Sequence, residues 1–278
     1  MKSAPFTLTS AERLEKNRAL FDTADNEIWH LTVYDAVHQG WRFTNIGGSQ
    51  ALRQIGARAR LTQASEVLEL CCGLGDTCCY LATHFHCRVT GMDINARQLA
   101  RARANLAVRH SSIHRQVRFI LCDILRWQPE QDFDLLFTMD SLMYVPEREC
   151  VLAQAARALR PGGMLALTEV LAGPNLNARA CRFMRDKEGV VSLPKAREQA
   201  KMLEDAGFEQ VTMCELTPLA VRCFETICCA TLEHRETLIE LEGARLYQER
   251  REDNQAYRDF FRDGTLVYFQ TFARMPAG

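Results

Sequence analysis

The sequence predicts an α/β fold in which a mostly parallel sheet carries helices on both faces. Between about residues 66 and 167, short apolar runs alternate with amphipathic helical stretches, which is typical of parallel sheets. A glycine-containing loop follows the first apolar run and leads into a helix. The chain has 278 residues, 47% of them hydrophobic and 25% charged, the balance of an ordinary globular protein.

The first half of the chain supplies most of the predicted sheet. Residues 1–20 are polar and charged, and residues 21–62 are helical in character and rich in aromatic residues. The predicted strands that follow are Val67–Leu70, Arg88–Met92, Val117–Leu121, Phe133–Phe137 and Met164–Leu167. Helices are expected between them, at about 76–85, 95–109 and 147–159.

The second half adds two strands and a helical insertion. A connector at 171–193 precedes a helix at about 194–206, which Gly207 closes as its C-cap. Strands are predicted at Glu209–Leu216 and Leu266–Ala273, separated by a charged helical stretch. We therefore expect an arm and helical cap over 1–62, a sheet domain over 63–218 and 263–278, and a helical lid over 219–262.

Charge and hydropathy limit the partners of the chain. With 34 Lys and Arg against 35 Asp and Glu, the net charge of −1 disfavours a nucleic-acid binder. No run of about 18 apolar residues occurs, so we expect no membrane partner. The N-terminus lacks the apolar stretch of a signal peptide, which favours a cytoplasmic protein.

The 12 cysteines are the unusual feature of the composition. Several form adjacent pairs inside apolar segments, where a thiol behaves as a small hydrophobic group, and this disfavours a disulfide framework. A zinc site is the second alternative, because Cys78, Cys79, His84, His86 and Cys87 lie within ten residues. These residues do not form two separated ligand pairs, so we expect no metal.

The loop at 69–76 predicts a site for an adenosine-containing cofactor. Gly73 and Gly75 follow a strand and open a helix, where the backbone can approach a ligand closely. Asp93 ends the next strand, where a carboxylate can accept hydrogen bonds from ribose hydroxyls. Cys78 stands where a dinucleotide fingerprint would have its third glycine. Asp123 ends the third strand and is placed to accept a hydrogen bond from an adenine amino group.

In order, the motifs E-L-x-C-G-x-G, G-x-D-I, C-D-I, F-D and L-R-P-G-G-M-L resemble class I S-adenosylmethionine-dependent methyltransferases over about residues 65–215. The resemblance implies a Rossmann-like seven-stranded sheet whose last strand is antiparallel, and S-adenosyl-L-methionine as cofactor. The cofactor residues that it implies are Glu69, Cys71, Gly73, Gly75, Asp93, Ile94, Gln98, Asp123, Ile124 and Met139. Cys71 departs from the family pattern, which has glycine there.

Within the resemblance, each part of the cofactor has its own residues. Glu69 and Gly73 would lie near the methionine end, and Met139 would meet the methionine amino group through its backbone. Asp93 would bind the ribose, and Asp123 with Ile124 would address the adenine.

A looser resemblance, over about residues 25–275, points to a narrower branch of the family. The aromatic N-terminal region, the helical insertion, D-S-L-M-Y-V at 140–145 and F-R-D-G-T-L-V-Y-F at 261–269 resemble two groups of enzymes. These are the sarcosine/dimethylglycine N-methyltransferases and the geranyl diphosphate C-methyltransferases. The resemblance implies a small-molecule methyl acceptor.

Asp140 is the leading candidate for a catalytic base or substrate anchor. Methylation of an amine needs a neutral nitrogen and methylation of a carbon releases a proton, so both favour a carboxylate near the methyl group. Asp140 ends the fourth predicted strand, and the diphosphate-methylating relatives imply a catalytic acid at this step. The alternative is that Asp140 only caps the following turn. Tyr144 either orients the substrate or packs in the core.

Aromatic residues before the sheet domain are further candidates. Tyr34 and His38 are four residues apart and would share one helical face. With Trp41 they would close over a sulfonium, which aromatic faces favour, or else belong to the core. Glu169, expected just past strand five, either contacts substrate or is an exposed loop acid.

Basic residues in the connector admit two interpretations. Arg179, Arg182, Arg185 and Lys187 either grip a carboxylate or diphosphate, or form a solvated helical face. The connector lacks the run containing an acid and a histidine that the diphosphate enzymes have, which disfavours C-methylation of a prenyl diphosphate.

The favoured function is methyl transfer to a small molecule, at nitrogen ahead of carbon or oxygen. The alternatives are a C-methyltransferase acting on a prenyl diphosphate or another specialised metabolite, an NAD-linked oxidoreductase and a non-catalytic binding protein. The sequence does not name the acceptor, and a homodimer stays open.

Overall fold

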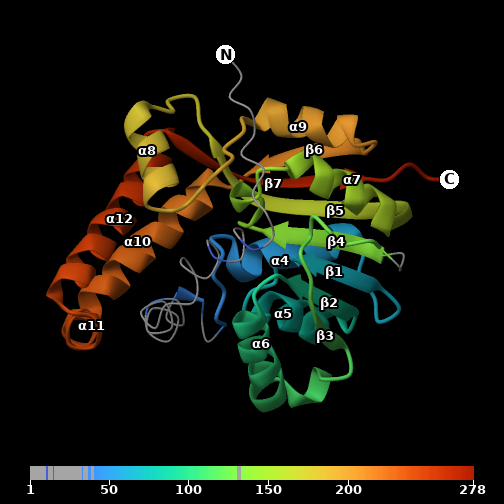
Figure 1. Ribbon diagram of the computed structural model, residues 1–278, viewed down its shortest axis with the longest axis horizontal. Coiled ribbons are helices and arrows are strands. Elements are labelled where there is room, and N and C mark those ends of the chain that lie inside the picture. The colour runs from blue at the N-terminus through green and yellow to red at the C-terminus, as the bar shows by residue number, and fades with distance from the viewer. Residues whose placement is uncertain (1–10, 12–14, 16–32, 34–36, 39–40, 130–132) are drawn as a thin grey trace.

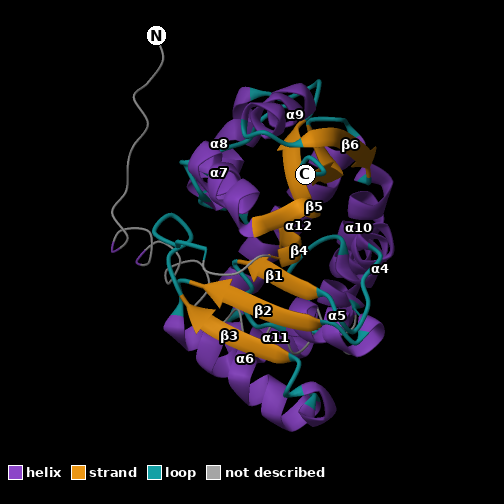
Figure 2. Ribbon diagram, turned by 90° about the vertical axis from the view of Figure 1, so that its right-hand side faces the viewer, coloured by secondary structure: helices purple, strands orange, loops and turns teal. Residues whose placement is uncertain are grey.

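A seven-stranded sheet with strand order β3-β2-β1-β4-β5-β7-β6 forms the centre of the fold (Figures 1 and 2). The computed structural model describes residues 11, 15, 33, 37, 38, 41–129 and 133–278. The strands are β1 (Glu66–Leu70), β2 (Arg88–Asp93), β3 (Val117–Leu121), β4 (Phe133–Met139), β5 (Leu159–Ala172), β6 (Glu209–Glu215) and β7 (Leu266–Arg274). Strands β1 to β5 pair in parallel, and β7 runs antiparallel to both β5 and β6. The predicted seven-stranded sheet with an antiparallel last strand is confirmed.

Helices cover both faces of the sheet, as the alternating pattern predicts. One face carries α4 (Gly48–Ala59), α5 (Asp76–Phe85) and α6 (Ala96–Arg109), and the other carries α7 (Arg148–Ala158) and α9 (Ala196–Asp205). Successive side chains of a strand point to opposite faces, so Val67 joins the first apolar cluster and Leu68 the second. Short 3₁₀ helices lie at Ser111–Ile113 and Leu142–Tyr144.

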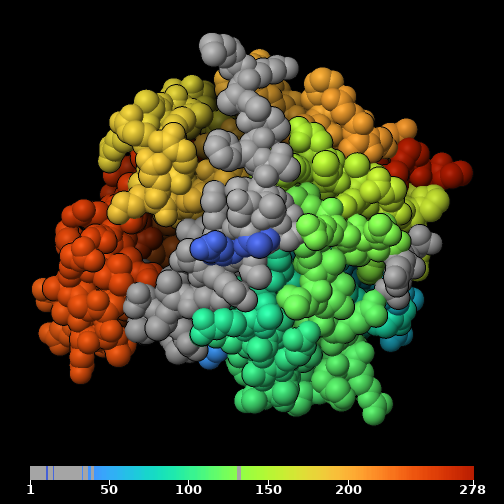
Figure 3. Space-filling model, viewed as in Figure 1, coloured from blue at the N-terminus to red at the C-terminus, as the bar shows by residue number. Residues whose placement is uncertain are grey.

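Three helices stand between β6 and β7, and we call them the lid (Figures 1 and 3). They are α10 (Thr217–Glu233), α11 (Arg235–Glu242) and α12 (Ala244–Arg262), and α8 (Ala178–Asp186) packs beside them. Aromatic side chains fill the space between α10 and α12, where the rings of Phe224 and Tyr257 stack with their centroids 4.8 Å apart. The lid therefore has an apolar core of its own, which continues to Tyr268 on β7.

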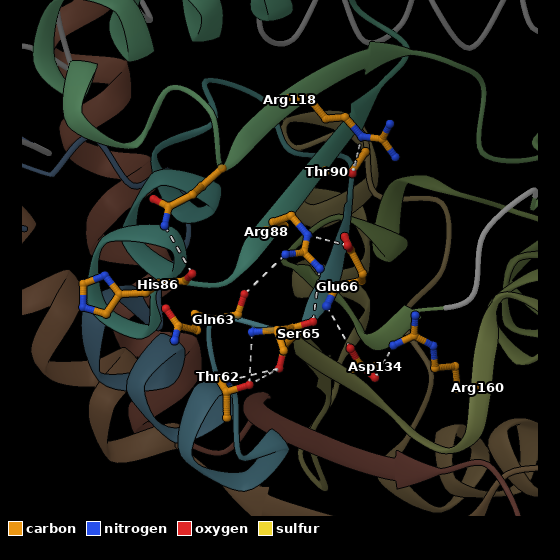
Figure 4. A network of polar contacts seen from close by, with 12 residues as sticks. Thr62, Gln63, Ser65, Glu66, His86, Arg88, Thr90, Arg118, Asp134 and Arg160 are labelled. Carbon is orange, nitrogen blue, oxygen red and sulfur yellow. Dashed lines mark hydrogen bonds and ion pairs between the residues drawn. The ribbon is translucent and has the colours of Figure 1, made fainter.

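Polar contacts tie the amino ends of the central strands together (Figure 4). The backbone N–H of Glu66 donates to Asp134 Oδ2 over 2.8 Å, and Arg160 Nη1 donates to Asp134 Oδ1 over 2.7 Å. Arg88 pairs with the carboxylate of Glu66 across β1 and β2. These contacts thus join the amino ends of the strands. In a parallel sheet a ligand site is expected at the opposite side, at the carboxyl ends of the strands.

Strand β5 differs most from its predicted extent of Met164–Leu167. It runs from Leu159 to Ala172 because its whole second half pairs with β7. The connector that follows contains α8, and none of the 12 cysteines forms a disulfide. Across the described segments, no helix combines the length and the apolar character that crossing a membrane requires.

Candidate active site

A cavity of about 530 Å³ lies at the carboxyl ends of the parallel strands and extends under the lid. The ends of β1 to β4 and the loops after them line one part, and residues of α10, α12 and the loop after α8 line the other. Eleven of the predicted site residues line this cavity: Glu69, Cys71, Gly73, Asp93, Ile94, Gln98, Asp123, Ile124, Met139, Asp140 and Tyr144. Residues far apart in the chain meet here because parallel strands present their carboxyl ends at one edge.

The loop after β1 brings backbone close to the cavity. Gly73 has a φ of +50°, and a Cβ placed on it would meet no atom within 4 Å, so its open side can receive a ligand. Cys71 has a φ of +58°, in the left-handed region that favours glycine. Cys71 therefore replaces the family's glycine at a position whose backbone conformation favours glycine.

Gly75 has a packing role and does not line the cavity. Its φ is +76°, and a Cβ placed on it would lie 2.4 Å from the ring of Phe119. Gly75 also precedes α5 as its N-cap residue. Gly75 is predicted to bind the cofactor, but it does not line the cavity, and its missing side chain leaves room for the ring of Phe119.

Asp93 holds the loop in place and faces the cavity. Its Oδ2 accepts a hydrogen bond from Gly73 N over 2.9 Å, and its Oδ1 accepts one from Asn95 N over 2.8 Å. A carboxylate oxygen has lone pairs for more than one hydrogen bond, so ribose hydroxyls can still donate to it. Asp93 is thereby fixed between the glycine loop and the start of α6.

Glu69 is a buried acid that lines the cavity at the end of β1. The hydroxyl of Thr77 donates to it over 2.5 Å, and the thiol of Cys78 donates over 2.9 Å. Burial raises the pKa of Glu69 to about 8. An ammonium group bound here would favour the ionised carboxylate, which suits the amino group of a methionine moiety.

These residues together fit S-adenosylmethionine. Asp93 at the end of β2 suits the ribose, and Asp123 after β3 suits the adenine. The open backbone of Gly73 and the buried carboxylate of Glu69 suit the methionine chain. When bound, this cofactor supplies an electrophilic methyl group on a sulfonium.

Asp140 is held on one side only. Its Oδ2 accepts hydrogen bonds from Ile46 N over 2.8 Å and from the hydroxyl of Tyr268 over 3.1 Å. Its Oδ1 is buried and has no hydrogen-bond partner within the described part of the chain. Burial raises the pKa of Asp140 to about 7, which is the range that suits a general base at neutral pH.

The other catalytic candidates lie in different places. Tyr144 lines the cavity from a short 3₁₀ helix. His38 packs edge-on against Phe43 with ring centroids 5.5 Å apart, does not line the cavity, and has its pKa lowered by burial to about 4. Trp41 stacks on Phe43 and His110 instead of covering the cavity. Tyr34 lies outside the described residues.

Glu169 is neither an exposed loop acid nor a cavity residue, and both expectations for it are wrong. It lies within β5, fully buried, and its carboxylate pairs with the guanidinium of Arg148 at 2.8 Å. Because β5 extends to Ala172, Glu169 falls inside the strand instead of after it.

Three of the four basic residues of the connector, Arg179, Arg182 and Arg185, lie exposed on α8, as the second interpretation expects, and Lys187 follows the helix. Arg179 lies over the ring of Phe260 at 5.5 Å, and Arg185 pairs with Asp186. Of the four predicted basic residues, only Lys187 lines the cavity.

Sequence reasoning missed the residue that supports Asp140 from β7 and the lining residues that come from the lid and from the loop after α8. These are Tyr268, which contacts Asp140, and the lining residues Glu188, Asp253 and Tyr257, and no motif marks them for this site. Tyr268 stands in the terminal stretch F-R-D-G-T-L-V-Y-F, which carries the looser resemblance but does not point to Asp140. Within the described ranges, no three His, Cys, Asp or Glu side chains come together in a way that would hold a metal ion.

The sheet order and the cavity at the strand ends are those of a Rossmann-like methyltransferase domain. Residues 67–163 match the family model described as "Methyltransferase domain". The 27-O-demethylrifamycin SV methyltransferase of Amycolatopsis mediterranei (strain S699) is 34% identical over 153 residues, which cover 54% of this chain and 56% of that protein.

Two solved structures share the fold. Haemonchus contortus phosphoethanolamine N-methyltransferase 2, in complex with phosphomonomethylethanolamine and S-adenosylhomocysteine, has a TM-score of 0.82 and 18% identity, covering 98% of this chain and 61% of that chain. Geranyl diphosphate C-methyltransferase from Streptomyces coelicolor A3(2) has a TM-score of 0.65 and 19% identity, covering 81% of this chain and 80% of that chain. The resemblance to S-adenosylmethionine-dependent methyltransferases is thus confirmed. The chain spans less than two thirds of the rifamycin methyltransferase and of the Haemonchus protein.

Proposed function

We propose that this protein transfers a methyl group from S-adenosylmethionine to a small-molecule acceptor, with Asp140 as the base or as the anchor of the acceptor. The observation that carries the proposal is the position of Asp140. One of its oxygens is fixed by Ile46 and Tyr268, and the other is buried at a cavity shared with the cofactor residues.

Methyl transfer is a displacement in which the acceptor atom attacks in line with the breaking bond, so positioning and exclusion of water contribute most. Asp140 accepts the proton that the acceptor atom loses, or holds that atom by a hydrogen bond. Asp93 and the glycine loop fix the cofactor on the sheet side, and the lid closes the cavity above the acceptor. Tyr144 contributes to the wall between these two parts.

An amine is the acceptor that the charge of the cavity favours. The lining outside the cofactor residues includes the carboxylates of Asp140, Glu188 and Asp253. Among the described lining residues, the two cations each face an acid: Lys187 lies 3.9 Å from Asp253, and Arg250 lies 3.3 Å from Glu242. Such a surface stabilises an ammonium or amine more readily than an anion.

A hydroxyl acceptor is the second candidate. It is supported by the relative whose name gives 27-O-demethylrifamycin SV as its substrate, and by an Asp140 pKa of about 7, which suits proton removal from a hydroxyl. Methylation of a prenyl diphosphate has less support, because three of the four basic residues expected to grip a diphosphate lie outside the cavity lining.

Cofactor binding is the first test. We expect S-adenosylhomocysteine to raise the melting temperature and to give a binding heat, and NAD to do neither. Stabilisation by NAD alone would favour the oxidoreductase alternative. Binding of neither compound would contradict the methyltransferase assignment.

Acceptor chemistry is the second test. Amines, phenols and prenyl diphosphates are each incubated with the protein and S-adenosylmethionine, and release of S-adenosylhomocysteine is measured. Turnover with amines is expected. Turnover confined to phenols or to prenyl diphosphates would assign the reaction to oxygen or to carbon instead.

A further inference from the structure

We infer that the lid side of the cavity carries a second carboxylate site, formed by Glu188 with Tyr257 and Asp253, that binds a hydrogen-bond-donating group of the acceptor remote from the atom being methylated. This inference rests on the proposed function, because it assigns the far end of the same acceptor. The ligand group it fits is an amine or a hydroxyl.

Glu188 is held in place from α12. It lies in the loop after α8 and accepts a hydrogen bond from the hydroxyl of Tyr257. Tyr257 is 8% exposed, stacks on Phe224 at 4.8 Å and meets Phe183 edge-on at 5.2 Å. The phenol that supports Glu188 is therefore fixed by rings on two sides, which gives the carboxylate a defined position at the cavity wall.

Charged side chains of both signs lie around Glu188. Asp253 lies one helical turn before Tyr257 on α12 and also lines the cavity, with Lys187 3.9 Å from its carboxylate. Arg250 is also near Glu188, but its guanidinium faces Glu242 at 3.3 Å. Burial raises the pKa of Glu188 to about 7, so a bound donor would favour its ionised form.

Asp140, on which the proposed function rests, gives a further reason to expect a ligand in this cavity. Its Oδ1 is buried at the cavity and has no partner among the residues that the structure describes. A buried carboxylate oxygen without a hydrogen bond is costly, and a donor on the acceptor would satisfy it. The cavity thus has one acidic group on the sheet side and a second on the lid side.

An apolar wall joins the two acidic groups. Cys223 on α10 lies near Asp140, and its neighbour Phe224 stacks on Tyr257, which holds Glu188. Both residues line the cavity. The acceptor that fits has an apolar body between two donor groups, as in an α,ω-diamine or an amino alcohol.

The experiment uses the full chain loaded with S-adenosylhomocysteine and measures probe affinity by calorimetry. The probes are unbranched diamines and amino alcohols of four to eight carbons, with alkylamines and dicarboxylates of equal length as comparisons. We expect at least one bifunctional probe to bind at least tenfold more tightly than its alkylamine, and dicarboxylates to bind most weakly. Equal affinity of the two amine classes, tighter dicarboxylate binding, or binding of no probe would overturn the inference.

Variants test whether Glu188 binds the second donor group of the probe. Glu188→Gln should reduce the tenfold preference to less than about twofold and leave the affinity for S-adenosylhomocysteine unchanged. Glu236→Gln, an exposed position on α11, is the matched control and should retain the full preference. Retention of the preference in Glu188→Gln would contradict the assignment. If S-adenosylhomocysteine itself fails to bind the unmodified protein, the proposed function fails as well, so the two failures are distinguishable.

Discussion

The hydroxyl of Tyr268 donates a hydrogen bond to Asp140 Oδ2 over 3.1 Å, which joins the last strand to the end of β4 across 128 positions of the chain. Tyr268 is fully buried, and Ile46 N donates to the same oxygen over 2.8 Å. Two donors therefore hold one side of the carboxylate, and Oδ1 stays available at the cavity. Tyr268 is a positioning residue for Asp140 in the proposed reaction.

Tyr268→Phe removes this donor while keeping the ring. Turnover should fall about tenfold or more, since a hydrogen bond to a charged group contributes about 1.5–3 kcal/mol. The hydrogen bond lowers the pKa of Asp140, so its loss should move the midpoint of the pH–rate profile upward. Tyr247→Phe is the control, because Tyr247 is also buried and its hydroxyl has no described hydrogen-bond partner. An unchanged midpoint in Tyr268→Phe would show that the tyrosine only packs.

Asp140 should impose a pH dependence on turnover. A base must be deprotonated, so turnover at saturating substrate should rise as pH increases through about 7 and level off above it. Asp140→Asn should lower turnover by about a hundredfold or more, the lower range for loss of general-base catalysis, and remove this rise. Affinity for S-adenosylhomocysteine should stay within a few-fold. Near-normal turnover in the variant would exclude Asp140 as the base.

Asp93→Asn tests whether the ribose of the cofactor binds at the end of β2. The dissociation constant of S-adenosylhomocysteine should rise about tenfold or more, because the variant loses a charged acceptor for hydroxyl donors. Asp205→Asn, at an exposed ion pair with Lys201, is the control and should leave the constant unchanged. Calorimetry measures both variants, and thermal unfolding checks that the loop held by Asp93 stays folded. Unchanged affinity in a folded Asp93→Asn protein would show that the ribose lies elsewhere.

Cys71→Gly should stabilise the protein. Cys71 has a φ of +58°, and a non-glycine residue in the left-handed region costs about 1–2 kcal/mol. Its replacement should raise the melting temperature by about 2–4 °C for each kcal/mol gained in a protein of this size. Cys72→Gly is the matched control next in the chain: Cys72 is 5% exposed and packed, so its loss should lower the melting temperature. A lower melting temperature for Cys71→Gly would mean that the contacts of the thiol outweigh the strain.

Buried acids should make the fold less stable as pH rises from about 4 to 8. Burial raises the pKa of Glu69 to about 8 and that of Glu188 to about 7, above their ordinary value of 4.5. The folded state therefore binds more protons than the unfolded state, and this contribution is complete below the unfolded pKa and is lost as pH rises through the folded pKa. The melting temperature measured against pH should fall less steeply in Glu69→Gln than in the unmodified protein. An identical slope would indicate that Glu69 ionises normally.

Much of the sheet could be predicted because local patterns encode it. The helix predicted at 76–85 matches α5, and the strand predicted from Leu266 matches β7 to within one residue. Eleven predicted site residues line the cavity because the loops after parallel strands always meet at one edge. The prediction that Glu169 lies past the fifth strand is wrong, because the length of β5 depends on pairing with β7 and not on its own composition.

The lid and β7 show what local patterns leave out. Glu188 and Tyr257 are separated by 69 positions, and their contact depends on how α12 packs beside the loop after α8. His38 and Trp41 carry aromatic rings suited to a sulfonium, but they pack against Phe43.

The sequence by itself determined the fold class, the methyltransferase resemblance and most of the residues at the strand ends that line the cavity, because strand periodicity, glycine conformation and acids at strand ends are local properties. Only the tertiary structure decided that Tyr268 supports Asp140 and that Glu188 faces the same cavity. These contacts follow from β7 lying between β5 and β6 and from the lid packing over the strand ends. Side-chain contacts between distant segments are set by packing of the whole chain, which no local pattern records.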